Sequence, residues 1–185
     1  MRDSTKNFVM GWELKLSQIK DADNHLNELY DKFTTLYTIY NRLYNEAHYV
    51  LKLKNSLEKI RYSDRAKATE IVVSFLGAKS IIDKVTIEHG QRDIDSVRTL
   101  LANGIFYINT SDGKPDEATD KDLLGNLISP SSEVRSKAIL SLIYNVRCNL
   151  IHGYKNFEEI QRLVIEPVAN LLQKIIELLK EKFLL

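Results

Sequence analysis

The longest run of apolar residues at helical spacing lies between residues 24 and 49. After each apolar position another follows three or four residues later: Leu26, Leu29, Tyr30, Phe33, Leu36, Tyr37, Tyr40, Leu43, Tyr44 and Ala47. Such spacing places the side chains on one face of an α-helix. We therefore predict a long amphipathic helix here, which continues or restarts between residues 50 and 60.

Two further helices are predicted in the centre of the chain. Ser63 is a typical N-cap residue, and Asp64 would lie at the positive end of the helix that Ser63 starts. That helix is expected to run unbroken to about Gly90. A shorter helix is expected over residues 94–102.

The segment around residues 105–121 has a different character. Residues 105–110, IFYINT, could be a short extended segment, but a single strand has nothing to pair with. The polar stretch SDGKPDEATD that follows contains glycine and proline, which is typical of a loop. We expect a mobile polar loop around residues 105–121.

The C-terminal third predicts two more helical regions. One begins with Ser131 or Ser132 as its cap and ends at or before Gly153, a natural residue for a helix C-terminus. The other runs over about residues 157–183. Pro167 falls inside it, so this region is expected to kink there or to split into two helices.

These elements predict an all-α fold, a bundle of about five to seven helices without a credible sheet. The chain has 185 residues with only 7 Gly and 3 Pro, which suits long helices in a single domain over residues 1–185. With a formal net charge of +1, the chain has no general basic excess that would indicate nucleic-acid binding. Any RNA binding would therefore use a local site.

Cysteine content and hydropathy bear on location. The lone Cys148 cannot form an internal disulfide, which favours a reducing, cytoplasmic compartment. The first residues lack the apolar stretch of a signal peptide. The most apolar tract, LVIEPVANLLQKIIELL, is interrupted by polar residues and proline, so neither a membrane span nor a membrane partner is predicted.

The candidate chemistry lies in YNVRCNLIHGYK, residues 144–155, which contains Arg147 and His152. On one continuous helix a spacing of five places the two side chains about 140° apart around the axis. They would converge only if the helix turns before His152, or if a second copy of the chain supplies a partner. A guanidinium can hold a phosphate, and an imidazole can transfer a proton near neutral pH.

The bare spacing is a weak signal, because the chain holds 9 Arg and 4 His. By itself it fits a helix-end arginine beside a capping histidine better than a catalytic pair. The whole string, however, closely resembles the signature of HEPN domains, the higher eukaryotes and prokaryotes nucleotide-binding family. TLYTIYNRLY (residues 35–44) and EIQRLVIEPVANLLQKIIELL (residues 159–179) are similar to the family's first and last helices.

The resemblance implies an α-helical domain that forms a homodimer, with the Arg/His motifs meeting at the interface. Many members are metal-independent endoribonucleases of toxin–antitoxin, antiphage defence and CRISPR systems, whereas others are binding modules without activity. It assigns proton transfer to His152 and phosphate stabilisation to Arg147, with RNA as the substrate and no cofactor or metal. Residues 62–130 do not align and could be a lineage-specific elaboration.

Four more residues are candidates for substrate binding or support of the site. Asn149 could orient His152 or a phosphate, or only stabilise the helix end. Lys155 could contact an RNA phosphate, or be a solvated lysine. Asn41 could line the site or brace a neighbouring helix. Tyr154 could be modified with AMP by a nucleotidyltransferase antitoxin, as in some toxin branches, or be an ordinary loop tyrosine.

One position departs from the family pattern. Active members often carry a polar residue directly after the arginine, whereas here Cys148 stands there and could simply be packed. No HExxH motif or Cys/His cluster indicates a metal. The sequence therefore leaves three hypotheses: a dimeric HEPN ribonuclease, a HEPN module that binds nucleotide, RNA or protein without catalysis, and a helical domain with no site.

Overall fold

The structure is a computed structural model that describes residues 1–20, 25–57, 61–87, 89–111, 114–151 and 158–184. Over these residues it is helical apart from loops and one minimal hairpin, which confirms the predicted all-α fold. The elements are α1 (Asp3–Gln18), α2 (Leu26–Leu53), α3 (Asp64–Ala66), a π-helical turn η1 (Lys67–Ile71), α4 (Val72–Leu76), α5 (Ala78–Thr86), α6 (Gly90–Ala102), β1 (Thr110–Ser111), β2 (Lys114–Pro115), α7 (Glu117–Leu127), α8 (Ser132–Ile151), a 3-10 turn η2 (Glu159–Gln161) and α9 (Arg162–Leu184).

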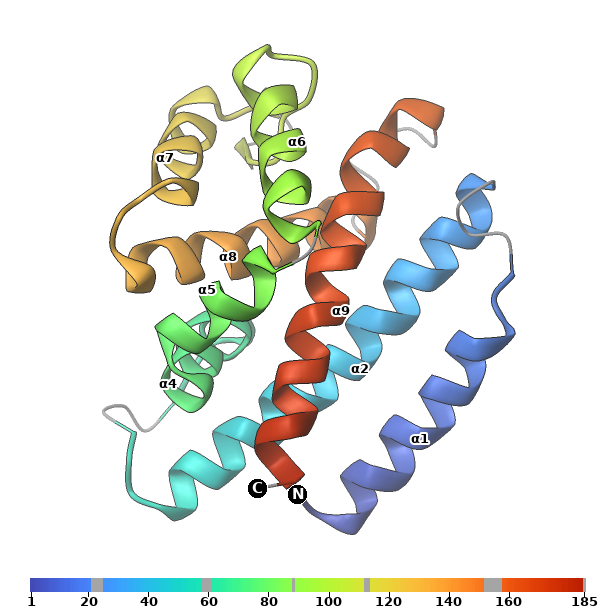
Figure 1. The fold of residues 1–185 in the computed structure, drawn as a ribbon, viewed down its shortest axis with the longest axis vertical. Helices are drawn as coiled ribbons and strands as arrows, with labels where there is room; N and C mark the ends of the chain where they lie inside the picture. Colours follow the sequence, from blue (N-terminus) through green and yellow to red (C-terminus); the bar gives the residue numbers. More distant parts are fainter. Residues whose placement is uncertain (21–24, 58–60, 88, 112–113, 152–157, 185) are drawn as a thin grey trace.

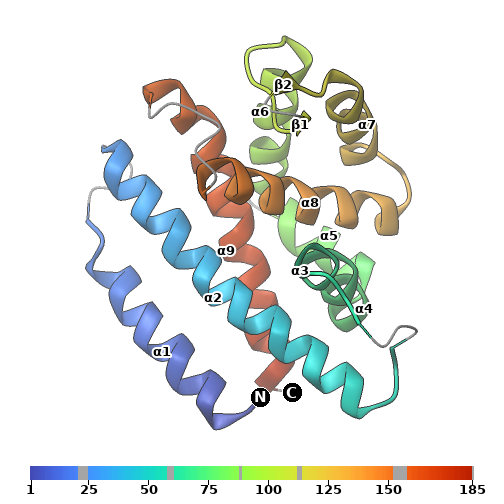
Figure 2. The ribbon, with the colours of Figure 1, turned by 180° about the vertical axis from the view of Figure 1, so that it is seen from behind.

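Helices α2 and α9 pack against each other along the middle of the bundle. Helix α1 lies along the outer side of α2, and the two chain ends come close together (Figure 1). Helix α8 crosses behind α9, with α5 and α7 packed against it. Seen from behind, α3 lies between α2 and α8 (Figure 2). This arrangement brings the middle of α2, the start of α3 and the end of α8 into one region.

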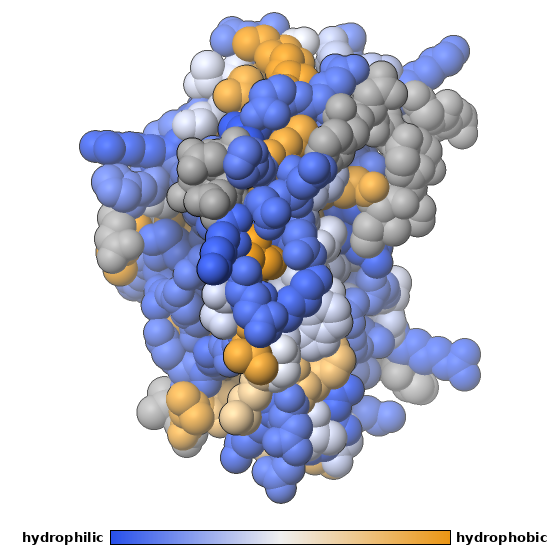
Figure 3. Space-filling view, turned by 90° about the vertical axis from the view of Figure 1, so that its right-hand side faces the viewer, coloured by the Kyte–Doolittle hydropathy of each residue, from blue (hydrophilic) through white to orange (hydrophobic). Residues whose placement is uncertain are grey.

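The core is formed mainly by aliphatic side chains of α2, α8 and α9, with a column of aromatic rings along α2. Phe33, Tyr37, Tyr40 and Tyr44 are each at most 4% exposed, and neighbouring rings contact at 5.2–6.3 Å between centroids. These tyrosines belong to the core, as their spacing predicts. On the face in Figure 3, apolar residues form small separate spots among hydrophilic ones.

Two predicted helix starts are confirmed, whereas α2 ends earlier than predicted. Helix α2 continues past residue 49 but only to Leu53, not to residue 60, and Asn55 then takes a left-handed conformation with φ 50°. The Ser63 side chain accepts a hydrogen bond from the Ala66 amide at 3.1 Å, as an N-cap does. The Ser131 hydroxyl accepts one from the Val134 amide at 3.4 Å at the start of α8. Helix α1 was not anticipated from the sequence pattern.

The predicted unbroken helix from Ser63 to Gly90 is wrong. Gly77 separates α4 from α5 with φ 90° and ψ 131°, a backbone conformation that residues other than glycine rarely adopt. The first turns are also not regular α-helix, because residues 67–71 form the π turn. The Tyr40 hydroxyl donates a hydrogen bond to the Ala68 carbonyl within that turn.

Two expectations for the segment around residues 105–121 are corrected. Residues 110–111 pair antiparallel with residues 114–115, so the extended segment does find a partner. Helix α7 begins at Glu117, inside the stretch expected to be a loop. The Asp116 side chain caps it by accepting a hydrogen bond from the Thr119 amide at 3.1 Å. The Asp-x-x-Thr pattern was a usable signal for this helix start.

The sequence left a kink or a split at Pro167 open, and the split is wrong, since α9 is one helix from Arg162 to Leu184 with Pro167 inside it. The missing amide would have bonded to the carbonyl of Leu163 in the first turn, and Leu163 is an exposed residue. Its carbonyl can be hydrated instead, so the interruption costs little. The first turns of α9 are inclined to the remainder in Figure 1.

Candidate functional site

Arg147 lies in the last turns of α8 and is partly buried. Its guanidinium carbon stands 5.3 Å from the centre of the Tyr37 ring, within the range of a cation–π contact. Its Nη1 approaches the Cys148 sulfur at 3.9 Å, and its Nε is buried without a hydrogen-bond partner among the described residues. The guanidinium is thus held by packing on α2, while part of its donor capacity is unused.

A run of polar groups on α2 continues from Tyr37. The Asn41 amide donates to the Tyr44 hydroxyl at 2.6 Å, and that hydroxyl donates to the Asp64 carboxylate of α3 at 2.7 Å. Tyr37, Asn41 and Tyr44 follow at intervals of four and three, so they share one face of the helix. Arg147 and Asn41 therefore meet the same strip of the α2 surface, one at Tyr37 and the other at Tyr44.

The strip extends one further turn toward the end of α2. The Asn45 amide donates to the Asn41 carbonyl at 2.9 Å, and Lys67 at the start of η1 donates to the Asn45 side chain at 3.2 Å. The His48 ring, three residues on, meets the Tyr62 ring edge-on at 5.7 Å between centroids. We call the set Tyr37, Asn41, Tyr44, Asn45, Asp64, Lys67 and Arg147 the polar strip.

Burial sets the protonation of the tyrosines along the strip. Burial raises the pKa of Tyr37 far above its ordinary value, although the nearby Arg147 charge opposes this. The pKa of Tyr44 is raised by burial and by its hydrogen bond to Asp64. The pKa of Tyr144 on α8 is raised by burial, by Cys148 and by Asp64. These hydroxyls remain protonated at neutral pH and can act only as hydrogen-bonding groups.

Asn149 has a structural contact. It is 6% exposed, and its side-chain amide donates to the Ile108 carbonyl at 2.7 Å. The buried Asp120 carboxylate of α7 accepts from the Ile108 and Asn109 amides, both at 3.0 Å. The chain at residues 108–109 is therefore clamped between α7 and α8, and Asn149 fixes the end of α8 against it.

An open groove of about 300 Å³ lies between α7 and α8 beside the strip. Arg65, which follows Asp64, and Asn145, which follows Tyr144, line it together with Ser141 and Asn126. The two larger hollows, about 400 and 610 Å³, lie elsewhere, along α6 and α9 around Asp93. Neither hollow is lined by Arg147 or by another residue of the polar strip.

His152, Tyr154 and Lys155 lie outside the described residues, so the structure places only Arg147, Asn149 and Asn41 of the predicted site. Arg147 and Asn41 come to the same strip, whereas Asn149 binds the backbone of another segment. In the described part of the chain no three His, Cys, Asp or Glu side chains gather as metal ligands would. No helix of that part is both long and apolar enough to cross a membrane.

Sequence reasoning missed Asp64, Lys67 and Tyr37 as members of the site. Tyr37, Asn41, Asn45 and His48 recur at helical intervals in the sequence, which indicated a mixed aromatic and polar face. Asp64 and Lys67 gave no such signal, because only the tertiary packing of α3 and η1 against α2 brings them there. The arrangement offers a fixed cation, several hydrogen-bond donors and one carboxylate at a partly open surface.

Comparisons with known proteins supply no relative. No family model matches the chain, no curated protein matches it, and no solved structure matches its fold. The functional assignment therefore has to come from the residues and their geometry.

Proposed function

We propose that this protein is a metal-independent endoribonuclease of the HEPN type. It would act as a homodimer that cleaves RNA by attack of a ribose 2′-hydroxyl at a site formed by Arg147 and His152. Its setting would be a prokaryotic toxin–antitoxin or antiphage defence system in the cytoplasm. An antitoxin would hold such a protein inactive, and Tyr154 is its expected target if that antitoxin is a nucleotidyltransferase.

The observation that supports this most is the environment of Arg147. Its charge is packed against Tyr37 near the end of α8, five residues before His152, and its Nε has no hydrogen-bond partner among the described residues. Burial opposes the charged form, but the Cys148, Tyr37 and Tyr144 groups outweigh that effect and raise the pKa of Arg147. A permanently charged, pre-positioned guanidinium suits the stabilisation of negative charge on a phosphate.

The chemistry needs a base and an acid. One imidazole would take the proton of the 2′-hydroxyl, whose oxygen attacks the adjacent phosphorus and displaces the 5′-oxygen of the next nucleotide. A second imidazole would give its proton to that leaving oxygen, so the products are a 2′,3′-cyclic phosphate and a free 5′-hydroxyl. Arg147 would stabilise the charge on the phosphorus oxygens. A two-fold dimer would supply both imidazoles from the two copies of His152.

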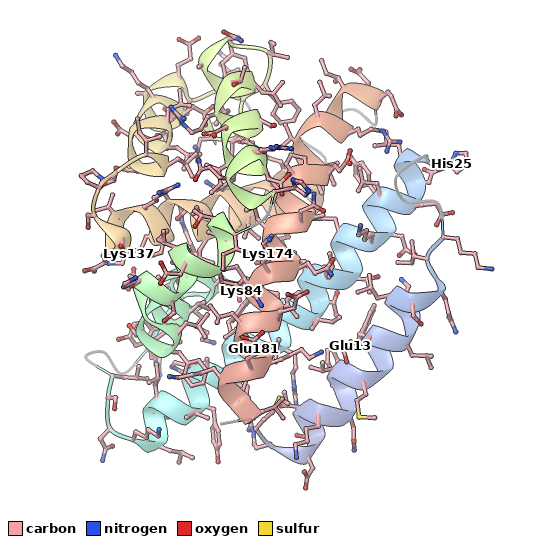
Figure 4. All side chains as sticks on the ribbon, in the orientation of Figure 1. Glu13, His25, Lys84, Lys137, Lys174 and Glu181 are labelled. Carbon is pink, nitrogen blue, oxygen red and sulfur yellow. The ribbon has the colours of Figure 1, made fainter. Side chains whose placement is uncertain are left out.

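The test is cleavage of single-stranded RNA in EDTA, with the ends of the products identified. The wild-type protein should leave 2′,3′-cyclic phosphate ends, and His152→Ala should lose at least about a hundredfold of the rate. His25→Ala is the matched control, because His25 is exposed at the start of α2 (Figure 4) and is not part of the polar strip. Equal cleavage by wild-type and His152→Ala protein would refute the proposal.

The second candidate is a HEPN module that binds nucleotide, RNA or a protein partner without cutting RNA. The partial burial of Arg147 and its contact with Cys148 favour it, because both use the guanidinium for packing. RNA binding that needs Arg147, combined with no cleavage of any RNA and no effect of His152→Ala on binding, would establish this alternative.

A further inference from the structure

The positive charge of the chain is concentrated in one segment. Residues 52–67 hold six basic and two acidic side chains, a net charge of +4, in a chain whose formal net charge is +1. The remaining residues are therefore net negative. The segment joins the end of α2 to η1, and its last part lies between α2 and α8 beside the polar strip (Figure 2).

Two lysines of this segment lie near a pair of rings. Lys67 reaches the Asn45 side chain, and the His48 and Tyr62 rings meet one turn further along α2. Burial, and then the positive charges of Lys67 and Lys52, lower the pKa of His48. Both lysines therefore lie close enough to His48 to act on it, although one comes from α2 and the other from η1.

Within the described residues these cations lack carboxylate partners. We call Lys52, Arg61, Arg65 and Lys67 the basic patch, and none of the four forms an ion pair there. Some cations elsewhere do have carboxylate partners: Lys84 of α5 points to Glu181 of α9 at 2.9 Å (Figure 4), and Lys180 pairs with Glu13 of α1. Lys52 and Lys67 act on His48, and Arg61 precedes Tyr62 in the chain. Cations without carboxylate partners beside aromatic rings suit a polyanion that carries bases.

We propose that the basic patch, with Tyr62 and His48, binds the phosphodiester backbone of single-stranded RNA and stacks one of its bases. This rests on the proposed function, because it names the surface that holds the substrate. Tyr37, beneath Arg147, and His48 are eleven residues apart, or about 16 Å along α2. The patch would therefore bind nucleotides beyond the cleaved phosphate and set the direction of the strand.

The test measures binding of a labelled oligouridylate of about twelve nucleotides. All proteins carry His152→Ala, so that no cleavage interferes. The patch variant is Arg61→Gln with Lys67→Gln, and the matched control is Lys121→Gln with Lys182→Gln, which removes the same charge from exposed sites on α7 and α9. The patch variant should bind roughly tenfold more weakly. The slope of the logarithm of its binding constant against the logarithm of the salt concentration should fall in magnitude by about 1.4, as expected for two lost phosphate contacts.

Stacking is tested at Tyr62. Tyr62→Phe should bind RNA as the parent does, whereas Tyr62→Leu should bind roughly tenfold more weakly because the ring is lost. Thermal unfolding of each variant separates a loss of binding from a loss of folding. Equal binding by Tyr62→Leu and Tyr62→Phe would overturn the stacking part of the proposal.

The outcomes separate this inference from the proposed function. If patch and control variants bind RNA alike, the patch is not an RNA surface, whether or not the wild-type protein cleaves RNA. If the patch variant loses binding only to vesicles of anionic phospholipid, the patch is a membrane-contact surface and the RNA proposal fails. If the patch variant loses RNA binding although the wild-type protein cleaves no RNA, the inference stands and the nuclease proposal falls.

Discussion

Tyr37 carries a hydroxyl that is buried and has no hydrogen-bond partner among the described residues. The ring itself contacts the Arg147 guanidinium. A buried hydroxyl without a hydrogen-bond partner lowers the stability of the fold. A phenylalanine ring, which lacks the hydroxyl, could still make the cation–π contact. The residue therefore holds Arg147 through its ring, at some cost to stability.

We expect Tyr37→Phe to unfold at the same urea concentration as the wild type, or to be more stable by up to about 1 kcal/mol. Tyr37→Leu, which removes the ring under Arg147, should lower the free energy of unfolding by about 1–3 kcal/mol. Urea unfolding followed by circular dichroism measures both. A loss of more than about 1 kcal/mol in Tyr37→Phe would mean that the hydroxyl does have a partner.

Glu46 is a buried carboxylate, 1% exposed, that fastens α1 to α2. It accepts hydrogen bonds from the Arg2 amide at 2.7 Å, from Arg2 Nε at 2.8 Å and from the Thr5 hydroxyl at 2.8 Å. Burial alone would raise the pKa of Glu46, but these bonds outweigh it, and the pKa lies below the usual 4.5. The charged form is therefore the one that the fold stabilises.

Because the pKa of Glu46 is lower in the folded than in the unfolded chain, its contribution to stability is complete above about pH 4.5 and is lost as the pH falls below that value. Glu46→Gln should reduce the free energy of unfolding by about 1–3 kcal/mol near pH 7, and the difference from wild type should shrink toward about pH 3. Glu70→Gln, at an exposed site, is the control and should change little. A difference that grows with acid would contradict this assignment.

At the scale of elements, the break between α4 and α5 shows how one glycine decides the path of the chain. Gly77 has φ 90°, whereas Gly125 in α7 has ordinary helical neighbours and nothing within 4 Å of an added Cβ. The turn at Gly77 lets α5 lie against α8. A side chain at Gly77 would be strained whatever the space around it.

Gly77→Ala should lower the free energy of unfolding by about 1–3 kcal/mol, because alanine is strained at that backbone conformation. Gly125→Ala should instead raise it by about 0.5–1 kcal/mol, because alanine loses less backbone entropy on folding within a helix. The two variants add the same methyl group, and thermal or urea unfolding compares them directly. Opposite signs are expected, so equal effects would refute the argument.

At the scale of the whole molecule, the proposed chemistry depends on assembly. A single chain supplies one histidine to the Arg147 motif, and separate acid and base require two. A symmetric dimer brings both from identical subunits. Activity should therefore belong to the pair of chains and not to either chain alone.

Mixing tests this directly. After subunit exchange between equal amounts of wild-type and His152→Ala protein, about a quarter of the dimers would be wild-type pairs, so the activity per wild-type chain should fall about twofold. An equal amount of His25→Ala should cause no such loss. Unchanged activity per wild-type chain after proven exchange would mean that each subunit works independently.

How much the sequence could determine varies along the chain. Helical spacing predicted the body of α2 but not its end at Leu53, and the Ser63 and Ser131 caps predicted two helix starts, because such signals are local and depend on residues within one turn. The Arg147 motif was likewise visible in consecutive residues, and the resemblance to a nuclease family that rests on it stays a prediction. The sequence also held signals for the break at Gly77 and the cap at Asp116. Gly77, however, lies within a strongly apolar helical pattern, and Asp116 lies within a stretch whose composition is typical of a loop.

Only the tertiary structure decided which residues surround Arg147. Tyr37 comes from a helix more than a hundred positions earlier, and Asp64 joins the strip because α3 packs between α2 and α8. Asn149, a site candidate by sequence, proves to hold the Ile108 carbonyl. Local patterns record which face of a helix is apolar, whereas the partner of each polar group depends on helix packing, which no short stretch of sequence specifies.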